Sequence, residues 1–276
     1  MTSLFARNVK VVVLASGSRG NCTYVGDGHG GLLVDCGIST RQVIERLQAA
    51  GIGRPRIDGV LVTHEHSDHA GACRILCNRL KEVSGQSVPF YMTRGTWYGL
   101  RPNMRPDAVE IIEAGVPFGI RHYRVDPFRV PHDTSDPVAF RVRVGGAWVG
   151  VITDLGRPTT LVQTKLRSMT IAVLEFNHDV QMLQEGSYTW ALKQRIRSSH
   201  GHLSNVQAAE LLSNGLSQDL RHLVLAHLSE DNNDARMARA EAEKVIQRAG
   251  AGGQVNIAVA RQDGAIAPVE ARANEW

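Results

Sequence analysis

The chain lacks any hydrophobic run long enough to cross a membrane. The longest apolar run near its start covers residues 11–15, whereas a membrane-spanning helix needs about 20 apolar residues. This run is also shorter than the apolar part of a signal peptide. The sequence therefore predicts a cytoplasmic protein with no membrane partner.

Internal repeats, low-complexity tracts and linker-like segments are absent as well. A chain of 276 residues can bury one large core without help from disulfides or structural zinc. We therefore predict a single domain over residues 1–276.

Cysteine is scarce and is not spaced for metal binding. The chain has four cysteines, and none belongs to a CxxC pair. Without a signal peptide, the thiols are expected to be reduced and buried. They are Cys22, Cys36, Cys73 and Cys77.

A large excess of one charge is also missing. The formal net charge is +4 and the isoelectric point is about 9.0. This mild basic balance is compatible with a nucleic-acid partner but does not establish one. Hydrophobic residues make up 43% of the chain and charged residues 21%, which argues against disorder, collagen-like repeats and coiled coil.

Short apolar runs alternate with turns along the chain. The order of strands and helices is too irregular for a doubly wound parallel sheet, and it favours two layers of sheet flanked by helices. The Gly145–Gly146 pair predicts a hairpin turn within a meander over residues 120–152. Further strands are predicted at residues 9–15, 23–25, 31–36, 58–63, 89–92, 109–112, 171–174, 223–226 and 255–260.

Helices are predicted where capping residues precede apolar residues at helical spacing. Ser39 and Gln42 fit a capping box at one helix start, and Gly51 stands where that helix would end. Ser204 and Gln207 repeat the capping pattern. Further helices are predicted at residues 70–80, 188–198 and 235–249.

The residues with the most specific chemistry are THEHSDH at positions 63–69. His64 and His66 are two positions apart in an extended segment, so they project to the same side. Asp68 and His69 follow where the chain turns toward the next helix. Four potential ligands within six residues are enough for two neighbouring metal ions, and four such residues are too many for ordinary strand caps or surface histidines.

Three polar residues further along can complete this centre, because a metal ion needs about three protein ligands. Each closes a β-rich run: FRVP precedes His132, VGVIT precedes Asp154, and LVLA precedes His227. Any one of them alone would be read as a loop residue. The predicted set has His64, His66 and His132 on one ion, Asp68, His69 and His227 on the other, and Asp154 between them.

The order of these residues resembles the metallo-β-lactamase superfamily, whose motifs are a strand-end Asp, HxHxDH, His, Asp and His. The resemblance covers about residues 9–230. It implies an α/β (α+β) fold, the αββα sandwich, in which two mixed β-sheets are flanked by helices. It also implies that Asp35, in LLVDCG, orients the histidine-rich loop through hydrogen bonds; an ordinary turn residue is the alternative.

A narrower resemblance rests mainly on SGSRGN at 16–21 and GHLSN at 201–205. These stretches are similar to the YycJ (WalJ) branch, bacterial single-domain nucleases described as 5′-exonucleases on DNA. The motif order also resembles ribonuclease Z, in which a Glu and a His outside the metal ligands assist the leaving group. Glu175 and His202 occupy those places.

Phosphodiester hydrolysis agrees with this chemistry. Two ions about 4 Å apart can activate a hydroxide and hold a phosphate oxygen, and they stabilise the charge of the transition state. The sugar oxygen is a poor leaving group, so a proton donor is useful. The predicted catalytic residues are Asp68, His202 and Glu175, with His202 as the general acid; a helix-capping role for His202 is the alternative.

Predicted substrate contacts begin in the loop after the first strand. Ser16, Ser18 and Asn21 alternate there with glycines, and their hydroxyl and amide groups can bind a 5′-terminal or scissile phosphate. A tight turn without a substrate role is the alternative. His178 is a further candidate for the lining of the pocket.

A second group of predicted substrate contacts lies on the helix before His202. Lys193 and Arg197 are one turn apart, with Arg195 nearby. They could contact the DNA backbone or form a solvated helix face. Trp190 is expected to be a core residue.

The leading function is a metal-dependent phosphodiesterase or nuclease, a 5′-exonuclease whose substrate is DNA, with RNA as the alternative nucleic acid. The alternatives are a small-molecule hydrolase (a cyclic phosphodiesterase, thioesterase or lactonase) and a non-catalytic nucleic-acid-binding protein. The GHLSN stretch and the basic balance favour the nuclease. Mixed His and carboxylate ligands suit two divalent ions per chain, Zn²⁺ or Mn²⁺. The sequence leaves the oligomeric state open.

Overall fold

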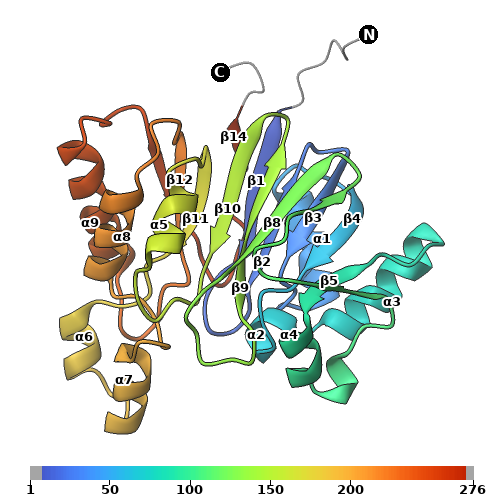
Figure 1. Ribbon diagram of the computed structural model, residues 1–276, viewed down its shortest axis with the longest axis horizontal. Helices are drawn as coiled ribbons and strands as arrows, with labels where there is room; N and C mark the ends of the chain where they lie inside the picture. Colours follow the sequence, from blue (N-terminus) through green and yellow to red (C-terminus); the bar gives the residue numbers. More distant parts are fainter. Residues whose placement is uncertain (1–7, 272–276) are drawn as a thin grey trace.

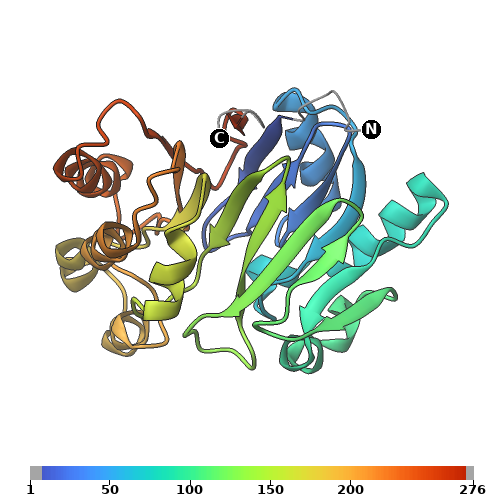
Figure 2. The same ribbon diagram turned by 45° about the horizontal axis from the view of Figure 1, so that its top comes forward.

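Two β-sheets packed face to face form the centre of the molecule (Figure 1). The structure is a computed structural model that describes residues 8–271, and within that range each sheet has seven strands. Helices cover the outer faces of the two sheets, as the turned view also shows (Figure 2). The predicted fold class, an αββα sandwich of two mixed sheets, is therefore confirmed.

The first sheet is antiparallel on one side and parallel on the other. Its strands in spatial order are β14 (Val269–Ala271), β1 (Val9–Ala15), β2 (Cys22–Gly26), β3 (Gly30–Val34), β4 (Arg56–Leu61), β5 (Phe90–Thr93) and β6 (Val109–Ile112). Neighbours from β14 to β3 are antiparallel, whereas β3 to β6 run parallel.

The second sheet has the same division. Its strands in spatial order are β13 (Asn256–Val259), β12 (His222–Ala226), β11 (Ile171–Glu175), β10 (Ala147–Ile152), β9 (Val138–Val144), β8 (Tyr123–Arg129) and β7 (Phe118–Ile120). β13 to β10 run parallel and β10 to β7 are antiparallel. Gly145 and Gly146 have φ angles of 57° and 94° between β9 and β10, so the predicted hairpin turn is confirmed.

Helices and one 3₁₀ turn connect the strands. They are α1 (Thr40–Ala49), α2 (Ser67–Ala70), α3 (Cys73–Ser84), α4 (Arg94–Gly99), η1 (Pro102–Met104), α5 (Thr160–Leu166), α6 (Val180–Glu185), α7 (Trp190–Arg197), α8 (Asn205–Gly215) and α9 (Ala235–Arg248). Both predicted capping boxes are present, at Ser39 with Gln42 and at Ser204 with Gln207.

The central strands, such as β1, β2, β3 and β11, are buried on both faces, which explains their nearly continuous apolar sequence. In β1, Val11 and Val13 pack between the sheets, while Val12 and Leu14 pack on the side that holds Val43 of α1. Both sheets follow this period of two. The sandwich thus has three apolar layers, one between the sheets and one under each helical layer.

The helix predicted at residues 70–80 is present as α3, but its predicted bounds are wrong, because a separate short helix, α2, precedes it. α2 ends at Ala70, and α3 begins at Cys73. The chain breaks because the Ala72 N–H donates to the Cys36 carbonyl, at 3.0 Å, instead of continuing α2. The short elements α4, α5, α6 and β14 are not predicted at all, because three to seven residues carry too little periodicity.

One edge of the sandwich gathers the carboxyl ends of β3 and β4 and of β10, β11 and β12. Helices α2, α4, α6 and α7 lie at this same end, the lower end in Figure 1. The polar motifs of the sequence follow directly after these strands. The prediction that residues 1–276 form one domain stays a prediction.

Candidate metal centre and active site

Three predicted residues leave their strands through a left-handed backbone conformation. Asp35 follows β3, Asp154 lies just beyond β10 and His227 follows β12, with φ angles of 63°, 62° and 56°. A residue with a β-carbon seldom adopts this conformation, which costs on the order of 1–3 kcal/mol. Such strain is concentrated at functional sites, and here it turns each chain sharply at the shared edge.

His64, His66 and His132 form one compact group of imidazoles. The ring centroid of His64 lies 4.8 Å from that of His66 and 5.0 Å from that of His132. The centroids of His66 and His132 are 5.1 Å apart. One nitrogen of each ring lies within 4.8 Å of the others. Three histidines at this spacing can hold one metal ion.

Asp68, His69 and His227 form a second group. The Oδ2 atom of Asp68 is 3.4 Å from Nε2 of His69 and 3.7 Å from Nε2 of His227. Asp68 and His69 lie on α2, whereas His227 comes from the opposite sheet. Both sheets therefore contribute to the second group.

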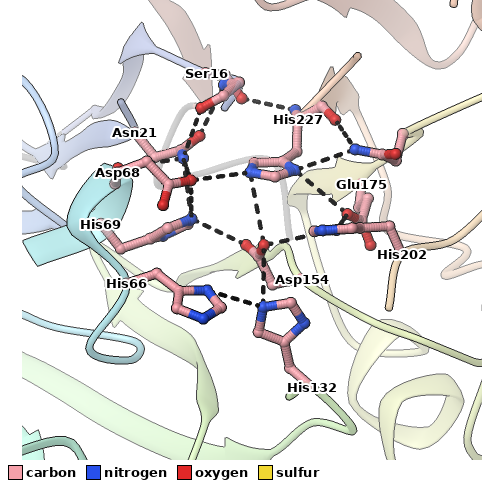
Figure 3. A network of polar contacts seen from close by, with 12 residues as sticks. Ser16, Asn21, His66, Asp68, His69, His132, Asp154, Glu175, His202 and His227 are labelled. Atoms are coloured by element: carbon pink, nitrogen blue, oxygen red, sulfur yellow. Dashed lines mark hydrogen bonds and ion pairs between the residues drawn. The ribbon is translucent and has the colours of Figure 1, made fainter. Parts of the chain in front are cut away.

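Asp154 lies between the two groups (Figure 3). Its Oδ1 is 3.7 Å from Nε2 of His132 in the first group and 3.6 Å from Nε2 of His227 in the second. Its Oδ2 is 3.2 Å from Nε2 of His69. The structure thus brings together all seven predicted ligands, with this carboxylate at the centre of the set.

Three buried atoms of this set are left without a hydrogen-bond partner among residues 8–271: His64 Nε2, Asp154 Oδ2 and His227 Nε2. An unpaired buried polar atom costs about 1–3 kcal/mol. All three are ligand-type atoms, and a bound cation would satisfy them. Because imidazole nitrogens and carboxylate oxygens suit divalent zinc or manganese, the residues present fit a metal centre.

Hydrogen bonds behind the ligands fix their orientation. Asp35 Oδ1 accepts from the Thr63 N–H at 2.8 Å, and its Oδ2 accepts from Nδ1 of His69 at 2.8 Å. His132 Nδ1 donates to the Gly201 carbonyl at 3.1 Å. Such partners direct Nε2 of each ring toward the other ligands and hold the ring in place. The contacts of Asp35 match its predicted orienting role.

The electrostatics of the site favour positive charge. Burial alone would lower the pKa of His69 and His227, but Asp154 and its neighbours raise it well above the usual range for His69 and to about 10 for His227. Burial alone would raise the pKa of Asp68 and Asp154, yet the surrounding histidines hold it well below the usual range. The same carboxylates would stabilise bound cations.

Beside the ligands, His202 forms a pair with Glu175. Nδ1 of His202 lies 2.7 Å from Oε1 of Glu175, and 3.7 Å from Oδ1 of Asp154. Glu175 is fully buried, and its Oε2 accepts from the N–H groups of Leu155 and Leu203. Burial would raise its pKa, but His202 lowers it to about 2. A charged carboxylate therefore holds His202 at the ligand set.

Five of the seven predicted ligands, together with His202, line a cleft of about 290 Å³. Its floor, named here the ligand floor, consists of His66, Asp68, His132, Asp154 and His227. One wall, named here the α7 wall, consists of Leu192, Arg195 and Ile196. Ser18, Asn177, Tyr188, His202 and Leu228 complete most of the remaining lining.

Of the predicted phosphate loop, only Ser18 lines the cleft. Ser16 is buried beneath it, and its Oγ accepts from the His227 N–H at 2.7 Å. The Asn21 side chain is buried too, bonded to Gly17 and lying 2.9 Å from Nε2 of His69. Ser16 thus supports the His227 backbone, Asn21 contacts the ligand-type atoms of His69 and Asp68 directly, and the prediction of a direct phosphate contact is retained for Ser18.

The other predicted contacts lie away from the cleft lining. His178 is buried next to Asn177, and burial lowers its pKa to about 4. Nζ of Lys193 donates to the carbonyls of Gln184 and Gly186 at 2.9 and 2.6 Å. Arg197 is exposed at the end of α7. For these residues a substrate role stays a prediction.

The core position expected for Trp190 is wrong. Its side chain is 70% exposed, because α7 has no buried residue at all within its eight positions. The large apolar side chain of Trp190 predicts burial, but no residue of this helix is buried. The spacing of one helix face, i, i+4, i+7 and i+8, is the sequence signal that could have found the residues facing the cleft. These residues are Tyr188, Leu192, Arg195 and Ile196.

The family model described as "Beta-lactamase superfamily domain" matches residues 31–227. This range begins in β3 and ends at the last predicted ligand, His227. The chain belongs to the metallo-β-lactamase superfamily. The predicted family resemblance is confirmed.

Two curated relatives belong to the predicted branch. The chain is 33% identical to exodeoxyribonuclease YycJ of Bacillus anthracis, over 87% of this chain and 90% of the relative. It is 31% identical to exodeoxyribonuclease WalJ of Streptococcus pneumoniae, over 83% and 85%. The crystal structure of YhfI from Bacillus subtilis, a metallo-β-lactamase fold protein, superposes with a TM-score of 0.69 at 16% identity, over 96% and 100% of the chains.

Membership of this superfamily and the clustered ligands make the protein a metal-dependent hydrolase. The cleft at the sheet edge is its candidate active site. No helix within residues 8–271 is both long and apolar enough to span a membrane.

Proposed function

We propose that this superfamily member is a DNA exonuclease that releases nucleotides from the 5′ end with two divalent ions. The observation that carries the proposal is the pair of His202 and Glu175, at 2.7 Å, directly beside the ligand floor. Hydrolysis of a DNA phosphodiester expels an alkoxide, which needs a proton. A histidine held by a buried carboxylate outside the main ligand set can give that proton. The names of the two curated relatives support DNA as the substrate.

The predicted ligands would hold Zn²⁺ or Mn²⁺, His64, His66 and His132 at one position and Asp68, His69 and His227 at the other, with Asp154 shared. Bound ions would supply a nucleophile at neutral pH and stabilise charge on the phosphate. The chain's own residues do the rest. Asp154 and Asp68 set the ligand geometry, Asp35 orients His69, and His202 donates to the leaving sugar oxygen.

His202 has a second possible role, because Asp154, Glu175, His202 and His227 also form a ligand-type group within 4.8 Å. The Glu175 contact argues for proton donation, since it occupies Nδ1 of His202 and leaves Nε2 for the substrate. Metal content of a His202 variant separates the two roles.

The experiment that tests the function is digestion of end-labelled single- and double-stranded DNA and RNA with Mn²⁺ or Zn²⁺. Substrates labelled at the 5′ or the 3′ end report the direction of digestion. We expect release of mononucleotides from the 5′ end of DNA. Inertness toward every nucleic acid, together with turnover of cyclic nucleotides, thioesters or lactones, would instead support a small-molecule hydrolase.

A further inference from the structure

Helix α7 is unusual because it stands beside the cleft without any buried residue. Most helices of this protein bury an apolar stripe against a sheet, whereas Leu192 is 37% exposed and faces the cleft. Leu228 lines the cleft from the loop after β12. Apolar side chains are therefore available to a molecule that enters the cleft.

Arg195 adds the charged group of this wall. Its Nε donates to Oδ2 of Asp133 at 2.6 Å, while Oδ1 of Asp133 lies 3.5 Å from Nε2 of His132. The carboxylate thus connects Arg195 to the ligand floor and fixes the direction of the guanidinium. Within residues 8–271 the two terminal nitrogens, Nη1 and Nη2, make no hydrogen bond, and the side chain is 60% exposed.

The neighbouring cations on α7 do not compete for this position. Lys193 is committed to two backbone carbonyls, and Arg197 does not line the cleft. Arg195 also lines an adjoining groove of about 410 Å³, together with Arg101. It therefore stands at the passage between the cleft and an open groove, in which Arg101 and Arg195 face the carboxylates of Glu65 and Asp68.

The size of the cleft limits what it can hold. A volume of about 290 Å³ lies at the lower end of the range for small-molecule pockets, which suits one nucleotide and not several. The side chains of Leu192 and Ile196 offer no hydrogen-bonding groups, so their packing does not depend on which base is present. A guanidinium is suited to bind a phosphate with two parallel hydrogen bonds.

We propose that the α7 wall is the subsite for the terminal nucleotide, in which Leu192 and Ile196 pack against the nucleoside and Arg195 binds the phosphodiester above the ligand floor. The remaining strand then leaves through the groove beside Arg101. This inference rests on the proposed nuclease function and deepens it. It predicts an enzyme that is insensitive to the identity of the terminal base but dependent on its presence.

Arg195→Ala tests the phosphate contact, with Gln194→Ala as the matched control on the other face of α7. A hydrogen bond to a charged group contributes about 1.5–3 kcal/mol, so we expect kcat/KM on DNA to fall roughly 10- to 100-fold. Metal content and the melting temperature should not change. Binding of a fluorescein-labelled oligonucleotide to the metal-free protein, read by anisotropy, should weaken and lose about one unit of its salt slope.

Arg195→Ala also leaves the Asp133 charge exposed beside the phosphate, and this charge alone could weaken DNA binding. A double variant separates that effect from the loss of the Arg195 contact. If Arg195→Ala with Asp133→Ala restores full binding, Arg195 only masks that carboxylate and the proposal is overturned. Weak binding by the double variant supports direct contact.

Terminal abasic nucleotides test the apolar part. The wild type should cut an abasic end about tenfold more slowly than a normal end, since burial of one apolar side chain contributes about 1.5–3 kcal/mol. Leu192→Ala with Ile196→Ala should remove this difference. Equal rates for both ends in the wild type would refute the subsite, provided that the wild type digests DNA; no digestion at all would refute the nuclease function instead.

Discussion

The ligand floor and the α7 wall border the same cleft but are built in opposite ways. Asp154 and His227 of the floor follow the ends of strands β10 and β12, which are buried on both faces. Their side chains are only 2% and 3% exposed. The wall is a two-turn helix with no buried residue. A rigid floor suits groups that must keep a fixed separation, such as metal ligands. An exposed wall can change its side chains without disturbing the core.

This difference assigns catalysis to the floor and the choice of substrate to the wall. The floor holds strained residues and unpaired ligand atoms, both of which only a fixed structure can maintain. The wall contributes contacts that act on the size and charge of the substrate. We therefore expect substitutions in the floor to affect catalysis most, and those at the rim of the cleft to affect substrate preference.

The largest effect is expected for Asp154→Asn. Asparagine tolerates the left-handed backbone at this position, so the fold should survive while the shared carboxylate is lost. We expect the rate of DNA hydrolysis to fall at least about 1000-fold, equivalent to about 4 kcal/mol. Glu82→Gln, on the exposed face of α3, is the control. More than about a tenth of the wild-type rate in Asp154→Asn would mean that the two-ion arrangement is wrong.

His202→Ala should have the next largest effect, and the effect should depend on the leaving group. A general acid contributes about 10²- to 10⁴-fold, so DNA hydrolysis should fall within that range. Hydrolysis of bis(p-nitrophenyl) phosphate expels a stabilised p-nitrophenolate, which needs little protonation. The variant should therefore hydrolyse this substrate at nearly the wild-type rate. His200→Ala, an exposed histidine two residues earlier, is the matched control.

The outcome also decides between the two roles of His202. Equal losses on both substrates would indicate that it binds the phosphate or holds the fold. A lower metal content would make it a ligand and would revise the ligand floor.

Sequence reasoning succeeded where a residue's position is set by a buried strand. His132, Asp154 and His227 each follow an apolar run, and such runs fix where the chain emerges from a sheet. It also located both capping boxes, because Ser39 and Ser204 act through local hydrogen bonds.

It failed where tertiary packing decides. Trp190 resembles a core residue by type, yet nothing in the sequence near it says that α7 packs against no sheet. The two serines of the phosphate loop differ in the same way. Ser16 and Ser18 have similar surroundings in sequence, but only the fold buries one beneath His227 and leaves the other at the cleft.

Asp35→Asn should produce a smaller effect, through the metal and not through the reaction. The carboxylate accepts from Nδ1 of His69, and loss of such a partner typically weakens metal binding 10- to 100-fold. Competition with a chromogenic chelator measures this change. At saturating metal the rate of hydrolysis should return toward the wild-type value. Unchanged metal affinity would leave Asp35 as an ordinary turn residue.

The smallest effect is expected for Ser18→Ala at the rim of the cleft. Ser18 is exposed, so its hydroxyl is free to donate to a 5′-phosphate without any cost from burial. One hydrogen bond from a neutral hydroxyl contributes about 1 kcal/mol, which corresponds to roughly a fivefold change. We expect the wild type to prefer 5′-phosphorylated over 5′-hydroxyl DNA and Ser18→Ala to lose about that much of the preference.

Asn21→Ala distinguishes the rim from the floor within this one loop. Because the Asn21 amide is buried and contacts Nε2 of His69 and Oδ2 of Asp68, its loss should weaken metal binding and leave the preference for a 5′-phosphate unchanged. Both variants are compared on 5′-phosphorylated and 5′-hydroxyl DNA at saturating metal, so that a change in metal occupancy is not mistaken for a change in phosphate recognition. If Asn21→Ala abolishes the preference while Ser18→Ala keeps it, the substrate contact lies beneath the cleft, and the division between a chemical floor and a selective rim fails in this loop.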